Sequence, residues 1–335
     1  MLHPYSIFGL HVCSNLPILG AQEISSGSAV DVCVHFGVVP PWAGRRAACA
    51  QSLLYSSPDK NRNGIPNLIV WAQLDTGHFR MRYADGTEFH LDRTGTEIWA
   101  TWPEEATLED TTTYLLGPIL GFVLRLRGTV CLHASAIAID GRAVALLGPP
   151  GAGKSTTAAA FAQLGYPIFS DDVVPLFEKE GEVFVRPGYP HLRLWPDSVN
   201  SLFGSAEALP RLTPTWDKRY YDLRQNGNRF QDKPLRLAAI YILGERSEDP
   251  GAPSVETLSS HDGLMTLVTN TYVNYLLDKE MRAREFELLS RVVRRIPLRR
   301  VRPRTDPSRV AQLCEVIVAD FRAQGSSAAD RQGVG

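Results

Sequence analysis

Residues 132–172 read LHASAIAIDGRAVALLGPPGAGKSTTAAAFAQLGYPIFSDD, and this stretch decides the fold. Within it, Gly148–Ser155 (GPPGAGKS) satisfies the GxxxxGK[ST] pattern of a phosphate-binding loop. The apolar run Arg142–Leu147 precedes the loop as a predicted strand. The Ala-rich run Lys154–Leu164 follows it as a predicted helix that Gly165 ends. Because the pattern lies between a strand and a helix, we predict an α/β fold with a P-loop core.

The loop has the chemistry that a nucleoside triphosphate needs. Glycines let backbone N–H groups turn inward around phosphate oxygens, and the positive end of the helix dipole adds to their effect. We expect Lys154 to reach the β- and γ-phosphates and the Ser155 hydroxyl to ligate Mg²⁺. Pro149 and Pro150 have no N–H group, so the cradle must begin at Gly151. The predicted nucleotide-binding residues are Gly148, Gly151, Ala152, Gly153, Lys154, Ser155 and Thr156.

Two adjacent carboxylates, Asp171 and Asp172, follow a short predicted strand, Tyr166–Ser170. Parallel strands of a right-handed βαβ unit end at the same edge of the sheet. If the two strands are neighbours or nearly so, both acids face the γ-phosphate. One acid can then hold Mg²⁺ and the other can accept the proton of an attacking hydroxyl. A turn or helix-cap aspartate is the structural alternative.

A histidine is placed near the loop by the register of a predicted hairpin. Thr129–Ile139 reads as one strand, and Asp140-Gly141 is a two-residue turn signal. That turn sets Ile139 opposite Arg142 and His133 opposite Gly148. His133 can then contact phosphates or assist proton transfer, whereas the alternative is a histidine bound to a backbone carbonyl.

The first 127 residues form a predicted β-rich module without a catalytic constellation. Strands are expected at Val30–Val39 and Leu68–Trp71, and a hairpin turns at Asp85-Gly86. A helix over Leu108–Leu126 should kink at Gly117-Pro118. We expect this module to recognise the substrate.

Residues 128–322 form the predicted P-loop domain, and residues 323–335 a disordered tail of small and polar residues. The further predicted strands are Val183–Arg186, Leu192–Trp195 and Leu237–Leu243, and the further predicted helices are Gly263–Leu277, Arg284–Val293 and Ser308–Arg322.

Composition excludes several classes of protein. The 335 residues are 44% hydrophobic and 21% charged, with a formal net charge of -1, which disfavours a dedicated nucleic-acid binder. The five cysteines contain no CxxC pair, so neither a zinc site nor a disulfide framework is expected, and a reducing cytoplasm fits. No apolar run is long enough to span a membrane, and the first twenty residues do not read as a signal peptide.

Residues 128–176 resemble the catalytic core of the HPr kinase/phosphorylase family. The shared features are a histidine-bearing strand, a hairpin, a phosphate loop with its helix, and an acidic pair after a short strand. A looser similarity, which includes Arg186–Pro190 (RPGYP), extends to about residue 320. The chain is most similar to the HPr-kinase-related proteins, some of which accompany peptide-modification gene clusters. The Gly-rich signature that follows the acidic pair in HPr kinases has no match here, so HPr is not the expected substrate.

The resemblance implies a fold of the phosphoenolpyruvate-carboxykinase type and phosphorylation of a serine on a peptide or protein, with ATP and Mg²⁺ as cofactors. By position it implies that Lys154 binds the nucleotide and that Asp171 is the catalytic base. Ser155 and Asp172 would be on the metal side, with His133 beside the phosphates.

Other side chains are candidates for supporting roles. Lys218 or Arg219 in the basic-aromatic run Thr213–Leu223 could stabilise the transferred phosphoryl group, although a solvated loop is the favoured interpretation. Glu245 could position a metal or form a salt bridge at a strand end. The seven arginines of Arg291–Arg304 could bind an acidic peptide or lie on solvated faces. Trp99, Trp102 and Trp195 are expected in the core or in interfaces.

We therefore predict a cytoplasmic, Mg-ATP-dependent serine kinase acting on a peptide or protein by in-line phosphoryl transfer. Its catalytic residues would be Asp171, Asp172, His133 and Lys154. No membrane or nucleic-acid partner is expected, and a homo-oligomer stays open. Two other functions also stay open: an NTP-hydrolysing switch or assembly ATPase, and a small-molecule kinase.

Overall fold

A computed structural model describes residues 2–25, 27, 29–42, 51–74, 77–225, 227 and 229–332, without the side chains of 325–332. The chain divides into two compact units. The N-terminal unit comprises Met1–Thr129, Leu212–Trp216 and Tyr272–Arg282, and the P-loop unit comprises the rest. The N-terminal unit thus takes up two short segments from the second half of the chain, which the predicted boundary at residue 127 leaves out.

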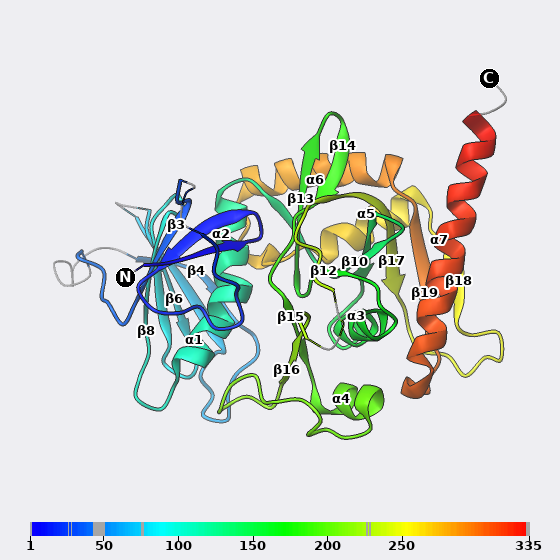
Figure 1. The fold of residues 1–335 in the computed structure, drawn as a ribbon. Helices are drawn as coiled ribbons and strands as arrows, with labels where there is room; N and C mark the ends of the chain where they lie inside the picture. Colours follow the sequence, from blue (N-terminus) through cyan, green and yellow to red (C-terminus); the bar gives the residue numbers. More distant parts are fainter. Residues whose placement is uncertain are drawn as a thin grey trace. The chain divides into compact units, whose positions relative to one another are not determined.

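The N-terminal unit is built on an eight-stranded sheet in the order β1-β2-β3-β8-β7-β6-β5-β4 (Figure 1). Alternate residues such as Val34, Met81 and Phe89 are fully buried, which is the pattern of a sheet with one face in the core. The hairpin predicted around Asp85-Gly86 is present as β6 and β7. The strands are β1 (His3–Ile7), β2 (Leu10–Ser14), β3 (Val32–Phe36), β4 (Gln51–Ser56), β5 (Leu68–Gln73), β6 (Phe79–Tyr83), β7 (Glu88–Leu91) and β8 (Glu97–Thr101).

The helix of the N-terminal unit is bent where the sequence predicts. α1 (Leu108–Tyr114) and α2 (Leu120–Leu126) are joined by a π-helical turn, η2 (Leu115–Ile119). Gly117 departs from helical geometry with φ -115° and ψ -107°, directly before Pro118. Proline removes a backbone donor and clashes with the preceding turn, so the kink has a local cause.

The P-loop unit contains a nine-stranded sheet with helices on both faces. The path β12-β10-β11-β17-β14-β13-β9 is extended by β19, which pairs with β17, and by β18, which pairs with β19. The strands are β9 (Val130–His133), β10 (Ser135–Ile139), β11 (Arg142–Leu147), β12 (Ile168–Ser170), β13 (Val173–Lys179), β14 (Glu182–Val185), β17 (Leu235–Leu243), β18 (Ser254–Thr257) and β19 (Leu298–Arg302), with β15 (His191–Leu194) and β16 (Arg219–Asp222) as a separate pair.

Alternation along β11 explains the three layers of the P-loop unit. Val144 and Leu146 pack with α3 (Lys154–Gln163) and α7 (Val310–Gln332), whereas Ala143, Ala145 and Leu147 pack with α5 (Ser260–Thr269) and α6 (Lys279–Arg295). Figure 1 shows these helix pairs on opposite faces of the sheet. A sheet buried on both faces reads as a continuous apolar run, as β11 does. The remaining helices of this unit are α4 (Pro196–Phe203) and η4 (Pro307–Arg309), whereas η3 (Asn274–Leu276) belongs to the N-terminal unit.

The topology brings the loop and the acids to the same edge of the sheet. β10 lies between β11 and β12 and is antiparallel to both, so β11 and β12 run in the same direction. The predicted condition that the two strands be neighbours or nearly so is therefore met, with one strand between them. The predicted hairpin register, with Ile139 opposite Arg142, is confirmed.

The prediction of one strand over 129–139 is wrong. The segment breaks at Ala134 into β9, which pairs with β13, and β10, which pairs with β11. His133 consequently lies opposite Val173, not opposite Gly148. The hairpin register could not be extended past Ala134, because the strand changes partner there.

Two helix boundaries also differ from the sequence prediction. α5 ends at Thr269 instead of continuing to Leu277, and Thr271 instead forms a β-bridge with Leu132. α7 continues to Gln332, so helix replaces the predicted tail as far as that residue. Its alanines at 323, 328 and 329 favour helix, which the reading of this stretch as small and polar underestimated.

Candidate active site

The P-loop follows β11 through backbone that only glycine accommodates. A Cβ on Gly148 would lie 2.9 Å from the Ala152 Cβ and 2.9 Å from the Leu243 carbonyl oxygen. Gly153 precedes α3 with φ +97°, in the left-handed region that L-residues rarely occupy. The glycines therefore set the path of the loop, and α3 begins at Lys154 with its first-turn N–H groups at the loop.

Lys154 is buried at the centre of this loop, with 7% of its surface exposed. Its Nζ donates to the carbonyl oxygens of Gly148 at 2.8 Å and Pro149 at 3.3 Å. Burial lowers the pKa of Lys154, and the nearby Asp172 and Asp171 partly oppose that effect. A desolvated ammonium group held by carbonyl oxygens of its own loop is poised to bind an anion that enters the site.

Asp171 connects the P-loop helix to the sheet. Its Oδ1 accepts a 2.9 Å hydrogen bond from Ser155 Oγ and a 2.6 Å bond from Ser135 Oγ. The carboxylate is 4% exposed. Ser155 and Asp171 therefore present one hydroxyl and one carboxylate at the same point, and both are oxygen ligands that Mg²⁺ accepts beside phosphate oxygens and water.

Asp172 is in a different environment from its neighbour. His133 Nδ1 lies 3.1 Å from Asp172 Oδ1, and both side chains are about one-third exposed. Asp172 has φ +71°, a left-handed conformation that is costly for a non-glycine residue. Strained backbone of this kind is concentrated at functional sites. Here it separates the two adjacent carboxylates, one bound to serine hydroxyls and one beside a histidine.

These side chains line one cavity of about 370 Å³. That volume lies within the range of roughly 300–1,000 Å³ typical of small-ligand sites. It brings together all four predicted catalytic residues and most of the predicted loop. The described lining residues are His133, Pro150, Gly151, Gly153, Lys154, Ser155, Thr156, Asp171, Asp172, Arg193, Leu194, Trp195, Ser198, Lys218 and Arg246.

Gly148 and Ala152, predicted to bind nucleotide, are not among these described lining residues. Gly148 instead supplies the carbonyl oxygen that accepts from Lys154 and the close backbone approach at the loop entrance. Ala152 is the contact that a side chain on Gly148 would strike. Both residues therefore help to set the backbone path of the loop.

Several lining residues were not predicted for the site, and three of them add charge or an aromatic ring. Arg193 on β15 and Arg246 after β17 add two cations. Trp195, expected in the core or an interface, is 58% exposed and forms part of the cavity wall. The strand pairing of β15 with β16 places Trp195 near Lys218, whose Nζ lies 5.0 Å from the centroid of the indole. This long-range pairing has no local sequence signal.

Of the three other candidates, Lys218, Arg219 and Glu245, one lines the cavity. Lys218 lines it. Arg219 is buried elsewhere, with Nη2 2.6 Å from Glu207 Oε1. Neither Arg219 nor Glu245 is among the described lining residues. Arg219 is therefore better explained by the salt bridge than by a role in catalysis.

The arginine-rich segment is largely bound within the fold. Arg291 pairs with Glu178 and Glu287, and Arg300 and Arg302 pair with Glu256. Arg299 contacts Asp320, Arg295 donates to the Gly181 carbonyl and Arg304 to the Pro250 carbonyl. Six of the seven arginines thus have partners inside the chain, which favours the interpretation as solvated faces.

Two kinds of feature are absent from the part of the chain that the structure describes. No group of three or more His, Cys, Asp or Glu side chains is placed to hold a metal ion. No helix there is long and apolar enough to cross a membrane.

The fold and the site define an α/β protein with a P-loop and an acidic pair at the same sheet edge. No family model matches the chain. Over 77 residues it is 34% identical to the HPr kinase/phosphorylase of Lactobacillus delbrueckii subsp. bulgaricus, which confirms the predicted resemblance for that stretch. The match covers 23% of this chain and 24% of that protein, so the chain spans about a quarter of the curated relative.

A solved structure can also be aligned with the chain. The Hpr(Ser) kinase/phosphatase from Coxiella burnetii aligns at 15% sequence identity with a TM-score of 0.34. The alignment covers 58% of this chain and 98% of that one.

Proposed function

We propose that the protein is a Mg-ATP-dependent kinase that phosphorylates a serine hydroxyl on a peptide or protein. One observation carries the proposal: Ser155 Oγ and Asp171 Oδ1 are 2.9 Å apart, and Asp172 lines the same cavity as Lys154. A P-loop with a second, differently held carboxylate can serve both metal binding and proton removal. The local similarity to an HPr kinase/phosphorylase supports the same reaction class.

The contacts favour an exchange of the two aspartate roles expected from the sequence. Asp171 is buried and accepts the Ser155 hydroxyl, which fits a carboxylate on the metal side. Asp172 is partly exposed beside His133, which fits a base that an acceptor can approach. We therefore assign Ser155 and Asp171 to Mg²⁺, and Asp172 with His133 to the proton.

In the proposed step, the acceptor oxygen attacks the γ-phosphorus while the bond to the ADP oxygen breaks. The acceptor proton passes to Asp172. Lys154 binds the β- and γ-phosphates, and Lys218, Arg193 and Arg246 add positive charge around the moving phosphoryl group. Cations placed before the reaction stabilise such a transition state without reorganisation. Mg²⁺ held by Ser155 and Asp171 would supply positive charge that offsets the charge of the phosphates.

The proposal is tested by incubating the full chain with γ-³²P-ATP, Mg²⁺ and peptides or proteins encoded beside its gene. The expected result is label on a serine, lost when that serine is changed to alanine and when Asp172→Asn enzyme is used. ATP turnover without a labelled acceptor, retained in Asp172→Asn, would instead indicate a switch or assembly ATPase. Label on a small metabolite would indicate a small-molecule kinase.

A further inference from the structure

The Asp171 carboxylate receives two serine hydroxyls on a single oxygen atom. Its Oδ1 accepts from Ser155 Oγ at 2.9 Å and from Ser135 Oγ at 2.6 Å. Among the residues that the structure describes, none donates a hydrogen bond to Asp171 Oδ2. A carboxylate oxygen accepts about two hydrogen bonds, so Oδ1 is saturated within the protein. Oδ2 is therefore the oxygen left for a ligand.

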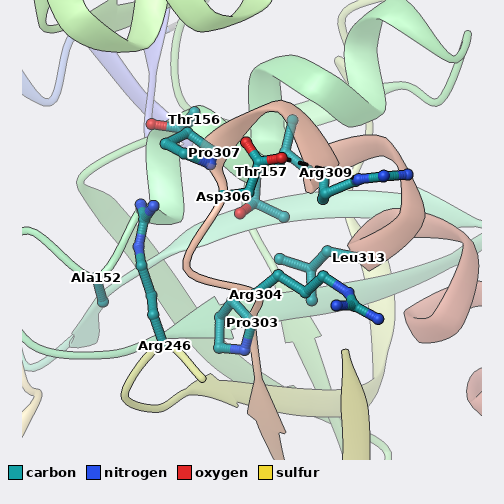
Figure 2. A pocket seen from close by; sticks show the side chains of 12 residues that line it. Ala152, Thr156, Thr157, Arg246, Pro303, Arg304, Asp306, Pro307, Arg309 and Leu313 are labelled. Carbon is teal, nitrogen blue, oxygen red and sulfur yellow. Dashed lines mark ion pairs between the residues drawn. The ribbon is translucent and has the colours of Figure 1, made fainter. Parts of the chain in front are cut away.

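The Ser155 hydroxyl is carried by α3, whose first turn is also packed on the side away from Asp171. Figure 2 shows Thr156 and Thr157 of this turn beside Asp306 and Pro307. The space between the turn and that segment is about 30 Å³, which is roughly the volume of one water molecule. The helix therefore presents Ser155 from a closely packed position.

The Ser135 hydroxyl comes from the sheet. Ser135 begins β10, which lies between the P-loop strand β11 and the strand β12 that precedes Asp171. The next residue, Ala136, pairs with Ser170 on β12, and the register shifts between Ala136 and Ile137. Irregularities of this kind are common beside active sites, where they re-aim a side chain. The strand pairing thus brings Ser135 to Asp171 from inside the sheet.

Ser135 is a polar residue in an otherwise apolar strand. β10 reads SAIAI, and the Ser135 side chain is fully buried. A buried hydroxyl costs free energy unless it is hydrogen-bonded, and a bond to a carboxylate is stronger than one between neutral groups. Ser135 lies outside the P-loop motif and is not among the described residues that line the cavity. Any effect of its hydroxyl on the site must therefore pass through Asp171.

We propose that Ser135 is a positioning residue that holds the Asp171 carboxylate in a fixed orientation for Mg²⁺. This rests on the proposed function, in which Ser155 and Asp171 are on the metal side. The two hydroxyls on Oδ1 restrict rotation of the carboxylate and leave Oδ2 available. Groups that orient a metal ligand in this way contribute about 10–100-fold to metal affinity.

The test measures the Mg²⁺ requirement of ATP binding, which needs no acceptor substrate. ATP binding to the full chain is followed by calorimetry over a series of Mg²⁺ concentrations. The variants are Ser135→Ala, Ser135→Thr, Asp171→Asn and the double variant Ser135→Ala with Asp171→Asn. Ser14→Ala is the matched control, because Ser14 is a fully buried serine of the N-terminal unit whose hydroxyl donates to the Leu16 carbonyl at 2.6 Å. Thermal melts check that each variant is folded.

We expect Ser135→Ala to raise the Mg²⁺ concentration for half-maximal ATP binding about tenfold. Ser135→Thr keeps the hydroxyl and should restore most of the affinity, and Ser14→Ala should match wild type. In the Asp171→Asn background, Ser135→Ala should add less than about a twofold change, because two residues that act through one contact are not additive.

A Mg²⁺ requirement of Ser135→Ala equal to that of wild type would overturn the proposal. A further loss of about tenfold from Ser135→Ala in the Asp171→Asn background would also overturn it, because the serine would then act independently of Asp171. Wild-type protein that binds no ATP, or binds it equally well with and without Mg²⁺, would instead overturn the proposed function, and this inference with it.

Discussion

The two units hold their buried charges in opposite ways. In the N-terminal unit, Glu88 accepts hydrogen bonds of 2.7 Å from both Arg80 and His90. Burial would raise the pKa of Glu88, but these partners outweigh it and hold the pKa at about 2. In the P-loop unit, Lys154 is bound by carbonyl oxygens of its own loop, and burial lowers its pKa.

The difference separates charges that stabilise a fold from charges kept for a ligand. In the Glu88 cluster, the carboxylate has both of its partners, Arg80 and His90, on strands of the same sheet. Lys154 is instead desolvated and faces two carboxylates in a cavity, so a triphosphate with Mg²⁺ can complete its interactions. Changes at Glu88 should therefore alter stability, whereas changes in the cavity should alter binding and catalysis.

The largest expected effect follows from removing the ammonium group of Lys154 from the active-site cavity. Lys154→Met should lower kcat/KM for phosphoryl transfer about 10³-fold, because Lys154 is the cation that the P-loop itself positions for the β- and γ-phosphates. Steady-state kinetics measures the loss, and a melting temperature close to that of wild type shows that the fold is kept. A near-normal kcat/KM in this variant would contradict the assignment of Lys154 to the phosphates.

The next effect distinguishes the two adjacent aspartates. Asp172→Asn should lower kcat by about 10²–10³-fold, the usual scale for a lost general base, without changing the Mg²⁺ concentration needed for half-maximal rate. Asp171→Asn should raise that Mg²⁺ concentration, because a metal-side carboxylate is lost. Titrations of the rate with Mg²⁺ separate the two cases. If Asp172→Asn raised the Mg²⁺ requirement and Asp171→Asn lowered kcat, the roles expected from the sequence would hold: Asp171 as the base and Asp172 on the metal side.

Breaking the Glu88 cluster should affect only stability. Glu88→Gln should destabilise the protein by about 1–3 kcal/mol, because Arg80 and His90 lose a half-buried ionised partner. Chemical denaturation measures this loss. ATP affinity should be that of wild type, so a matching loss of ATP binding would contradict the separation of the two units' charges.

The pH dependence of stability should follow the same cluster. The pKa of Glu88 is lowered on folding, so its contribution is complete above the ordinary glutamate value of 4.5 and is lost as pH falls toward about 2. Acid melts of wild type should lose stability across that interval more steeply than melts of Glu88→Gln. Parallel acid profiles would mean that Glu88 is not held by its partners.

The smallest effect concerns the pH dependence of nucleotide binding. Because burial lowers the pKa of Lys154, its ammonium form is lost at a lower pH than that of an ordinary lysine. ATP affinity should therefore fall as pH rises through that lowered value, by less than about tenfold per pH unit for a single group. Calorimetry between neutral and alkaline pH measures the fall, and Lys154→Met should not show it.

Local sequence patterns predicted the P-loop and the kinked helix, but they did not predict which strands pair with one another. Gly148–Ser155 and Gly117-Pro118 carry their geometry in adjacent residues, so the P-loop and the bend were predictable. The break at Ala134 was not, because β9 and β10 have equally apolar sequences and differ only in the strands they join. Arg193 and Trp195 reach the cavity through similarly distant pairing.

The most direct test is a crystal structure of the full chain with Mg²⁺ and a non-hydrolysable ATP analogue. The account predicts that Lys154 Nζ contacts the β- and γ-phosphates and that Mg²⁺ lies at Ser155 Oγ on the Asp171 side. Asp172 should face the γ-phosphate from the His133 side. A triphosphate whose terminal phosphate points away from both aspartates would contradict the proposed kinase and leave only a nucleotide-binding loop.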